Sequence, residues 1–77
     1  MVELIIESAT AIIKRLEKLG FRLHRQKGSH AQYVAKRDGR HYLVTVPVHR
    51  GDLHTPVIAS IIRQSGLSRD EFYTNTR

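Results

Sequence analysis

The chain contains no cysteine and no tryptophan among its 77 residues. Without thiolates, disulfide bonds and cysteine-ligated zinc sites are excluded. The apolar core must therefore be built from Ile, Leu and Val together with three Tyr and two Phe. A chain of this length can bury only a small core, so we expect a single domain over residues 1–77.

Long apolar runs are also absent. A helix that crosses a membrane needs about 20 consecutive apolar residues, and no stretch of this sequence is nearly that long. The first ten residues, MVELIIESAT, lack the basic segment and the cleavage site of a secretory signal. The lack of cysteine is in keeping with a reducing compartment. We therefore expect a cytoplasmic protein without membrane contact.

Acidic residues are scarce in the middle of the chain. Between Lys14 and Arg40, nine Lys or Arg accompany only Glu17 and Asp38, whereas four bases and three acids follow from Arg50 onward. A small domain with one basic half is typical of proteins that bind a polyanion, most often nucleic acid. A solvated surface that keeps the protein soluble has the same composition, so composition alone leaves both interpretations open.

The first regular element is a helix. Apolar residues at positions 9, 12, 13 and 16 recur at the helical spacing, while charged residues occupy the opposite side. Ser8 is placed to cap the start of this helix, and Gly20 to end it, with the apolar Phe21 behind. For residues 1–7 we expect an extended or partly ordered arm.

Three strands are predicted next, over residues 21–26 (FRLHRQ), 30–36 (HAQYVAK) and 41–47 (HYLVTVP). The alternation in the first strand predicts Phe21 and Leu23 on one face. In the second strand, alternation divides the side chains into an inward face of Ala31, Tyr33 and Ala35 and an outward face of His30, Gln32 and Val34. A turn at Lys27-Gly28-Ser29 and a tight Asp38-Gly39 hairpin join the strands into an antiparallel meander.

Two helices complete the chain. Thr55 followed by Pro56 predicts a capped helix start, apolar residues at 57, 58, 61 and 62 form its buried stripe, and Gly66 ends it. Ser68 and Glu71 have capping-box spacing for a short last helix, and residues 74–77 are predicted to fray. The order αβββα(α) predicts an α+β fold with helices on one face of a three-stranded antiparallel sheet and the other face open to solvent.

His30 is the candidate for chemistry, because it follows the Gly28-Ser29 turn on the open face of the sheet. An unperturbed imidazole titrates near about pH 6.5 and can give or take a proton. Arg25 and Lys27 would supply positive potential, and the turn amides could hold a phosphate oxygen. On the residue type alone, an exposed turn histidine that has no function is the more common interpretation.

The other histidines, at positions 24, 41, 49 and 54, are interpreted as surface or loop residues. A metal site would need paired ligands, but His49 and His54 lie five apart in a loop and no carboxylate pair supports them. We therefore expect neither a metal nor another cofactor.

Four blocks of sequence carry a resemblance to a known family. They are residues 12–18 (IIKRLEK) with Gly20-Phe21, residues 27–30 (KGSH), residues 44–47 (VTVP) and residues 61–67 (IIRQSGL). In this order they resemble the HicA family, small mRNA-interferase toxins of toxin–antitoxin modules whose fold is similar to the double-stranded-RNA-binding domain. The resemblance covers residues 8–72, with an N-terminal extension at 1–7 and a tail at 73–77. It departs from the family at residues 51–56, where many members have more lysine and glycine.

The resemblance implies that His30, the histidine of the G-S-H turn, is the catalytic residue of a metal-independent mRNA endonuclease. It also implies a HicB-type antitoxin that covers the site. RNA brings its own nucleophile, the 2′-hydroxyl, so such an enzyme needs only to move protons and stabilise phosphate charge. We expect the RNA contacts to come from Arg22, Arg25, Lys27, Gly28 and Ser29, and we expect no DNA contact for the toxin alone.

Two other functions remain to be weighed. A non-catalytic RNA-binding module of the same fold would place a lysine cluster at the start of its second helix. This chain has His54-Thr55-Pro56 there and no lysine after Lys36, which speaks against such a module. A domain that only binds protein, docking an acidic partner on its basic face, is the third possibility.

Overall fold

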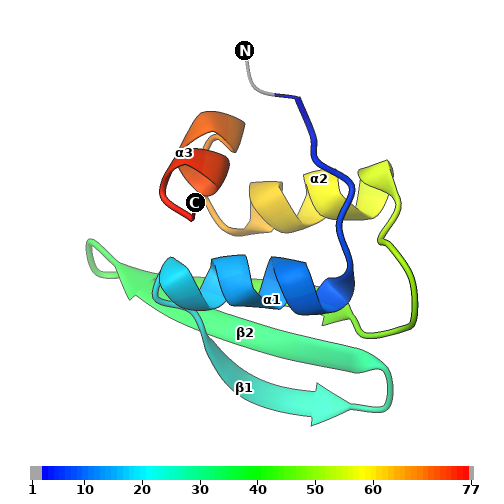
Figure 1. The fold of residues 1–77 in the computed structure, drawn as a ribbon. Coiled ribbons are helices and arrows are strands. Elements are labelled where there is room, and N and C mark those ends of the chain that lie inside the picture. The colour runs from blue at the N-terminus through cyan, green and yellow to red at the C-terminus, as the bar shows by residue number, and fades with distance from the viewer. Residues whose placement is uncertain (1–2, 77) are drawn as a thin grey trace.

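The computed structural model describes residues 3–76, and its elements follow the predicted order (Figure 1). They are α1 (Ala9–Lys18), β1 (Arg22–Lys27), β2 (His30–Arg37), β3 (Arg40–Pro47), α2 (Thr55–Gln64) and α3 (Arg69–Thr74). The predicted αβββα order with a further short helix is thus confirmed. The outer ends of the predicted extension and tail, residues 1, 2 and 77, lie outside the described residues.

Helix α1 begins and ends where its sequence indicated. The Ser8 hydroxyl accepts a hydrogen bond from the Ala11 N–H at 3.2 Å, which satisfies one of the free amides of the first turn. Ile12 and Leu16 are buried on the side that faces the sheet. Gly20 has a φ of 92°, the left-handed conformation that ends a helix after its C-cap.

The sheet is an antiparallel meander in the order β1-β2-β3, with β2 in the centre. Asp38 and Gly39, which join β2 to β3, both have positive φ values of 51° and 75°. This is the conformation that a two-residue type I′ hairpin requires, and its twist matches that of the strands. The predicted Asp-Gly hairpin is confirmed.

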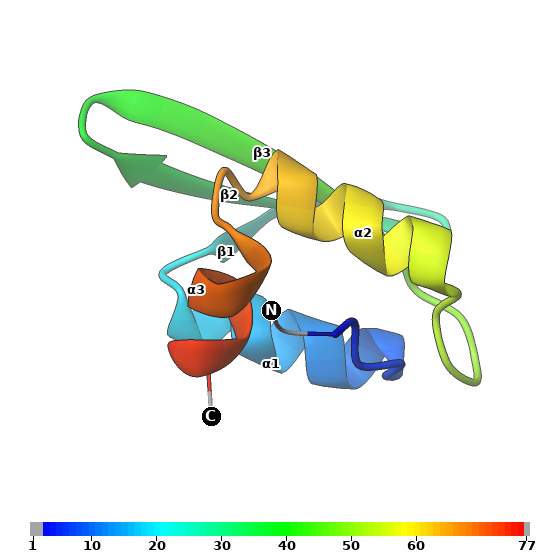
Figure 2. The ribbon, with the colours of Figure 1, turned by 90° about the horizontal axis from the view of Figure 1, so that it is seen from above.

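All three helices lie on one side of the sheet (Figures 1 and 2). Ala31, Tyr33 and Ala35 of β2 are buried beneath them, as predicted, and Val44 and Val46 of β3 extend the same core. The side chains of alternate residues therefore face solvent on the opposite side of the sheet. We call that side the open face.

Leu23 lies on the side of the helices, as the alternation with Phe21 predicted, but it is not buried there. Phe21 is buried, but Leu23 is 54% exposed, and β1 starts only at Arg22. Leu23 does pair with Tyr33 on the side of the helices, yet every residue of β1 is exposed. The physical reason is that the helices pack over β2 and β3 and leave the edge strand uncovered (Figure 1).

The start of α2 differs from the prediction by one residue. The N-cap is His54, which makes no side-chain capping bond, and Thr55 is already helical. Pro56, within the first turn, has no N–H to leave unsatisfied. At the other end Gly66 has a φ of 77°, as expected for the residue that ends the helix.

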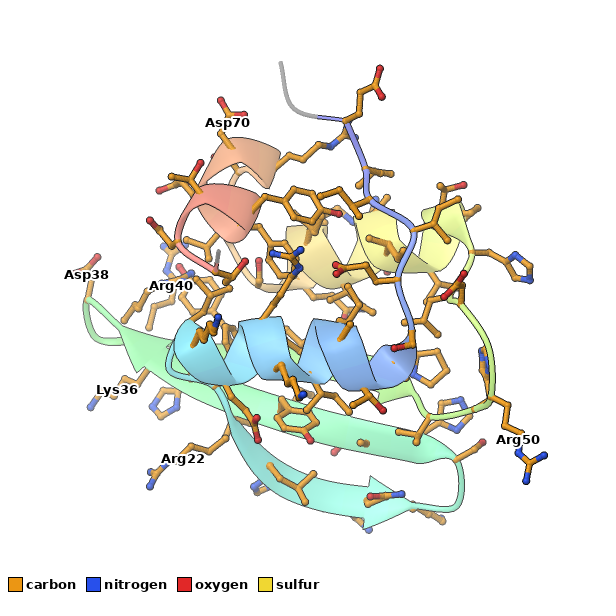
Figure 3. The ribbon with its side chains drawn as sticks, in the orientation of Figure 1. Arg22, Lys36, Asp38, Arg40, Arg50 and Asp70 are labelled. Atoms are coloured by element: carbon orange, nitrogen blue, oxygen red, sulfur yellow. The ribbon has the colours of Figure 1, made fainter. Side chains whose placement is uncertain are left out.

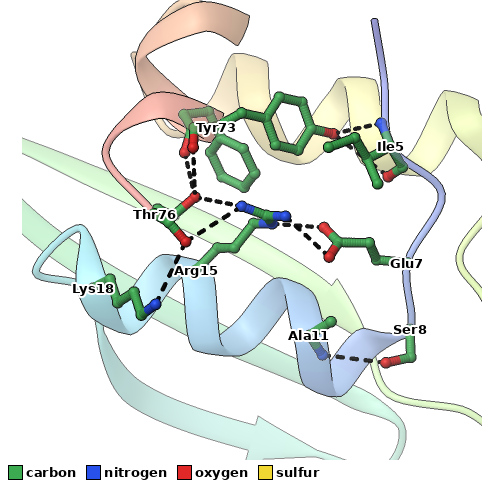
Figure 4. Close-up of polar contacts among 9 residues, drawn as sticks. Ile5, Glu7, Ser8, Ala11, Arg15, Lys18, Tyr73 and Thr76 are labelled. Carbon is green, nitrogen blue, oxygen red and sulfur yellow. Dashed lines mark hydrogen bonds and ion pairs between the residues drawn. The ribbon is translucent and has the colours of Figure 1, made fainter.

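The C-terminal segment is more ordered than its composition suggested. The capping box of α3 is formed, with the Ser68 N–H donating to Glu71 Oε1 at 2.9 Å. Thr76 is only 4% exposed and accepts a hydrogen bond from Arg15 at 2.7 Å (Figure 4), so the predicted fraying at residues 74–76 is wrong. The predicted extended arm is confirmed for residues 3–7, which pass beside α3, where the Ile5 N–H donates to Tyr73 Oη at 3.0 Å.

Candidate functional site

His30 opens β2 directly after a two-residue turn. Lys27 of β1 and Pro47 of β3 lie opposite it on the two sides, so its backbone is held within the sheet. Gly28 has a φ of 59°, which most side chains would disfavour, and this permits the tight reversal between Lys27 and His30. The Val48 N–H donates to the Ser29 carbonyl at 2.6 Å and ties the end of β3 to the turn.

The exposed side chain of His30 borders a hollow on the open face. The hollow has a volume of about 350 Å³ and is lined by Arg25, Lys27, His30, Gln32 and Thr45. These residues form two adjacent cross-strand rows, because Lys27 pairs with His30, and Arg25, Gln32 and Thr45 lie side by side. We call it the His30 hollow.

An irregularity in β1 brings its basic residues to this face. Leu23 pairs with Tyr33, but Arg25 pairs with Gln32, so one extra residue, His24, is inserted in β1. Side chains alternate along a strand, and an extra residue moves all later side chains to the other face. Arg25 and Lys27 therefore share the open face with Arg22, which a regular strand would not allow.

The predicted RNA-contact residues are only partly gathered at one place. Arg25 and Lys27 line the His30 hollow, whereas Arg22 pairs with Val34 and lines a second hollow farther along the sheet. Gly28 and Ser29 form the turn that positions His30 but do not line its hollow. The structure thus separates Arg22 from the residues with which it was grouped.

Gln32 and Thr45 are the members of the hollow that sequence analysis did not propose as site residues. Gln32 was assigned to the outward face, but its place between Arg25 and Thr45 depends on the register of three strands. The signal that could have found Thr45 is the same alternation, applied to β3 after aligning it through the Asp38-Gly39 hairpin.

The electrostatic environment of the open face is positive. The three strands contain no acidic residue, and four of their six bases, Arg22, Arg25, Lys27 and Lys36, lie on the open face, while Arg37 and Arg40 lie on the side of the helices. On the opposite face, burial and the negative charge of Glu17 raise the pKa of the Tyr33 phenol above its ordinary value. Tyr33 therefore stays neutral in the core.

Among residues 3–76, no three His, Asp or Glu side chains are grouped in a way that could hold a metal ion. The same part of the chain contains no helix long and apolar enough to span a membrane.

Comparison with protein families matches residues 9–67 to the model described as the HicA toxin of bacterial toxin–antitoxin. The chain belongs to the HicA toxin family. No curated protein matches the sequence. Within this HicA-family chain, the matched region runs from α1 to the end of α2 and contains both hollows, while the N-terminal arm and α3 lie outside it.

Proposed function

We propose that this HicA-family toxin is a metal-independent endoribonuclease that cleaves mRNA, with His30 as its catalytic acid–base residue. The observation that carries this proposal is the exposed imidazole of His30 beside two cationic side chains, Arg25 and Lys27, in one hollow on a rigid sheet. Proton transfer by a positioned histidine and charge stabilisation by nearby cations are the two contributions that RNA cleavage requires.

The proposed step uses the 2′-hydroxyl of the RNA as its nucleophile. The 2′-oxygen attacks the adjacent phosphorus while His30 accepts its proton, and the bond between phosphorus and the 5′-oxygen breaks. Water protonates the departing 5′-oxygen, which leaves a cyclic phosphate on one fragment and a 5′-hydroxyl on the other. Arg25 and Lys27 stabilise the additional negative charge on the phosphate oxygens as it develops.

We further propose that the partner in the toxin–antitoxin module is a HicB-type antitoxin that covers the His30 hollow in the cytoplasm. The positive open face favours a partner surface rich in carboxylates opposite Lys27. A complex in which the His30 hollow is fully exposed would mean that inhibition occurs by another route.

The decisive experiment compares RNA cleavage by His30→Ala with cleavage by His24→Ala. Loss of a positioned acid–base group costs on the order of 10²–10⁴ in rate, so His30→Ala should lose cleavage and growth arrest. His24 is an exposed histidine of β1 that lines neither hollow, and its replacement should leave the rate unchanged. Circular dichroism checks that both variants fold, and wild-type cleavage by folded His30→Ala would overturn the proposed mechanism.

The non-catalytic RNA-binding alternative makes a different prediction for the same assay. A wild-type protein that binds RNA but leaves it uncut, and whose expression does not arrest growth, would support that alternative.

A further inference from the structure

A second hollow lies at the other end of the sheet, where β1 departs toward α1. Its volume is about 410 Å³ and it is lined by Gly20, Arg22, Val34, Ala35, Lys36 and His41. The pairing of β1 ends with Arg22 opposite Val34, so no residue of β1 is paired with Ala35 or Lys36. The shortness of β1 at this end therefore creates the hollow, which we call the Lys36 hollow.

The polar groups of the Lys36 hollow are basic. Lys36 pairs with His41 across β2 and β3, and Arg22 approaches from β1. Figure 3 shows Arg22 and Lys36 extending from the sheet on the side away from α1, whereas Arg40 lies on the side of the helices. Neither hollow is lined by an acidic residue, so the cations of the Lys36 hollow are available to an anionic ligand.

An apolar strip on the open face runs from the lining of the Lys36 hollow toward the His30 hollow. Val34 and Leu43 pair with each other on the open face, and Leu43 is 48% exposed. Together with the exposed imidazole of His41, they offer flat surfaces against which an unpaired base can rest. Cations that follow a backbone, combined with aromatic or apolar platforms for bases, are what surfaces for single-stranded nucleic acids use.

The two hollows are arranged along one strand. His30 and Lys36 are six residues apart on β2, which places them about 20 Å from one another at the usual rise of a strand. An RNA strand lying along β2 can therefore occupy both hollows at once, with the cleaved phosphodiester at His30 and a more distant nucleotide at Lys36.

We propose that the Lys36 hollow is a second RNA subsite, in which Lys36 and Arg22 each contact a backbone phosphate and His41 stacks on a base several nucleotides from the cleaved bond. This inference rests on the proposed function, because it assigns both hollows to one RNA molecule. An acidic protein segment would satisfy the cations equally well, but it would leave the apolar strip and the imidazole of His41 without a role. The combination therefore favours RNA.

The test measures binding of a 2′-O-methylated single-stranded RNA of about 12 nucleotides, a length within the range of single-strand binding sites. Such RNA lacks the free 2′-hydroxyl and cannot be cut by the proposed mechanism, so affinity is measured separately from cleavage. The variant is Arg22→Ala/Lys36→Ala. The control is Arg40→Ala, which removes the same type of charge from the other face of the sheet.

For single strands, each phosphate contact lowers the logarithm of affinity by about 0.7 for every tenfold increase in salt. Over the decade between 0.1 M and 1 M salt, one contact is therefore worth about a fivefold factor in affinity. We expect the double variant to bind about 25-fold more weakly and to have a smaller salt slope, and Arg40→Ala to bind as the wild type does. In the wild type, RNA should shift the amide resonances of Lys36 and His41 in an NMR titration.

Each outcome decides one of the two proposals. If the double variant binds as tightly as the wild type, the second subsite is wrong even if the wild type cleaves RNA. If the wild type binds through Lys36 but never cuts unmodified RNA, the subsite stands and the nuclease function falls. If the double variant keeps its RNA affinity but no longer binds a poly-glutamate peptide that the wild type binds, the hollow is a docking surface for an acidic protein.

Discussion

Arg15 and Glu7 form a two-pronged ion pair that joins α1 to the N-terminal arm. Arg15 Nε lies 2.6 Å from Glu7 Oε1, and Arg15 Nη2 lies 3.1 Å from Oε2 (Figure 4). The same guanidinium stacks 4.9 Å from the ring centroid of Tyr73 in α3 and donates to Thr76. Arg15 thus connects both segments that flank the region matched to the HicA family.

Replacing Glu7 by Gln should lower the free energy of unfolding by about 1–3 kcal/mol, because the guanidinium of Arg15 would lose its counter-charge in a half-buried site. The two side chains are 17% and 19% exposed, so water replaces the lost interaction only in part. Glu3→Gln is the control, since it removes the same charge from an exposed position in the same arm. Urea denaturation measures both, and equal stabilities would contradict a structural role for the pair.

Gly66→Ala should destabilise the fold by about 2–4 kcal/mol, because strain and steric overlap act together. The backbone of Gly66 has a φ of 77°, and an added Cβ would lie 2.7 Å from Arg37 Nη2 and closer still to the ring of Tyr42. Arg37 and Tyr42 cannot move aside freely, because the guanidinium stacks 4.3 Å from the ring centroid and donates to the Ser65 carbonyl.

The matched control for Gly66 is Gly51→Ala. Gly51 has a similar φ of 82°, but an added Cβ there would meet no atom within 4 Å. Only the backbone strain of about 1–2 kcal/mol should remain. If thermal denaturation shows that the two variants lose the same stability, the overlap with Arg37 and Tyr42 does not contribute to the cost of Gly66→Ala.

Stability should fall with acidification partly through Glu71. Hydrogen bonds from the backbone and side chain of Ser68, with a smaller contribution from Arg37, lower the pKa of this carboxyl below its ordinary value. A carboxylate whose pKa is lowered in the folded state stabilises the fold above its unfolded pKa, and this stabilisation is lost as the pH falls through the folded pKa. The free energy of unfolding of the wild type should therefore exceed that of Glu71→Gln by the largest amount at neutral pH. Denaturation at several pH values measures this difference, and a difference that grows as the pH falls would contradict the prediction.

RNA affinity should decrease steeply as salt rises from about 50 to 200 mM, because each phosphate contact releases counterions. Lys27→Ala should reduce the salt slope by about 0.7, the value for one contact with a single strand. Arg63→Ala, an exposed cation near the end of α2, should leave the slope unchanged. Affinity that does not depend on salt would argue against binding through the open face.

Cleavage should persist in EDTA, because the proposed step uses only the RNA hydroxyl, water and the side chains of His30, Arg25 and Lys27. Time courses of RNA cleavage with and without EDTA should overlap. Activity that is lost with EDTA and restored by a divalent ion would overturn this mechanism.

The order of the elements was predictable because it depends on local chemistry. Ser8, Gly20, Gly66 and the Ser68 capping box act within one helical turn, and the Asp38-Gly39 pair needs only its own two left-handed residues. The inward face of β2 followed from alternation alone, since one face of the sheet had to be buried. The predicted N-cap of α2 was wrong by one residue, because His54 occupies the N-cap position instead of Thr55 and makes no side-chain capping bond.

By itself, therefore, the sequence determined the αβββα order, the turn that precedes His30 and the positive charge of the strands. Only the tertiary structure decided which charges act together, because that depends on pairing between strands and on which strands the helices cover. The extra residue in β1 turns Arg25 and Lys27 toward His30. Because β1 begins only at Arg22, this residue lies apart from them and lines the Lys36 hollow. The order of residues 74–76 depends on both local and tertiary contacts, because Thr76 donates to the nearby Phe72 carbonyl and accepts a hydrogen bond from Arg15, which lies 61 positions earlier in the chain.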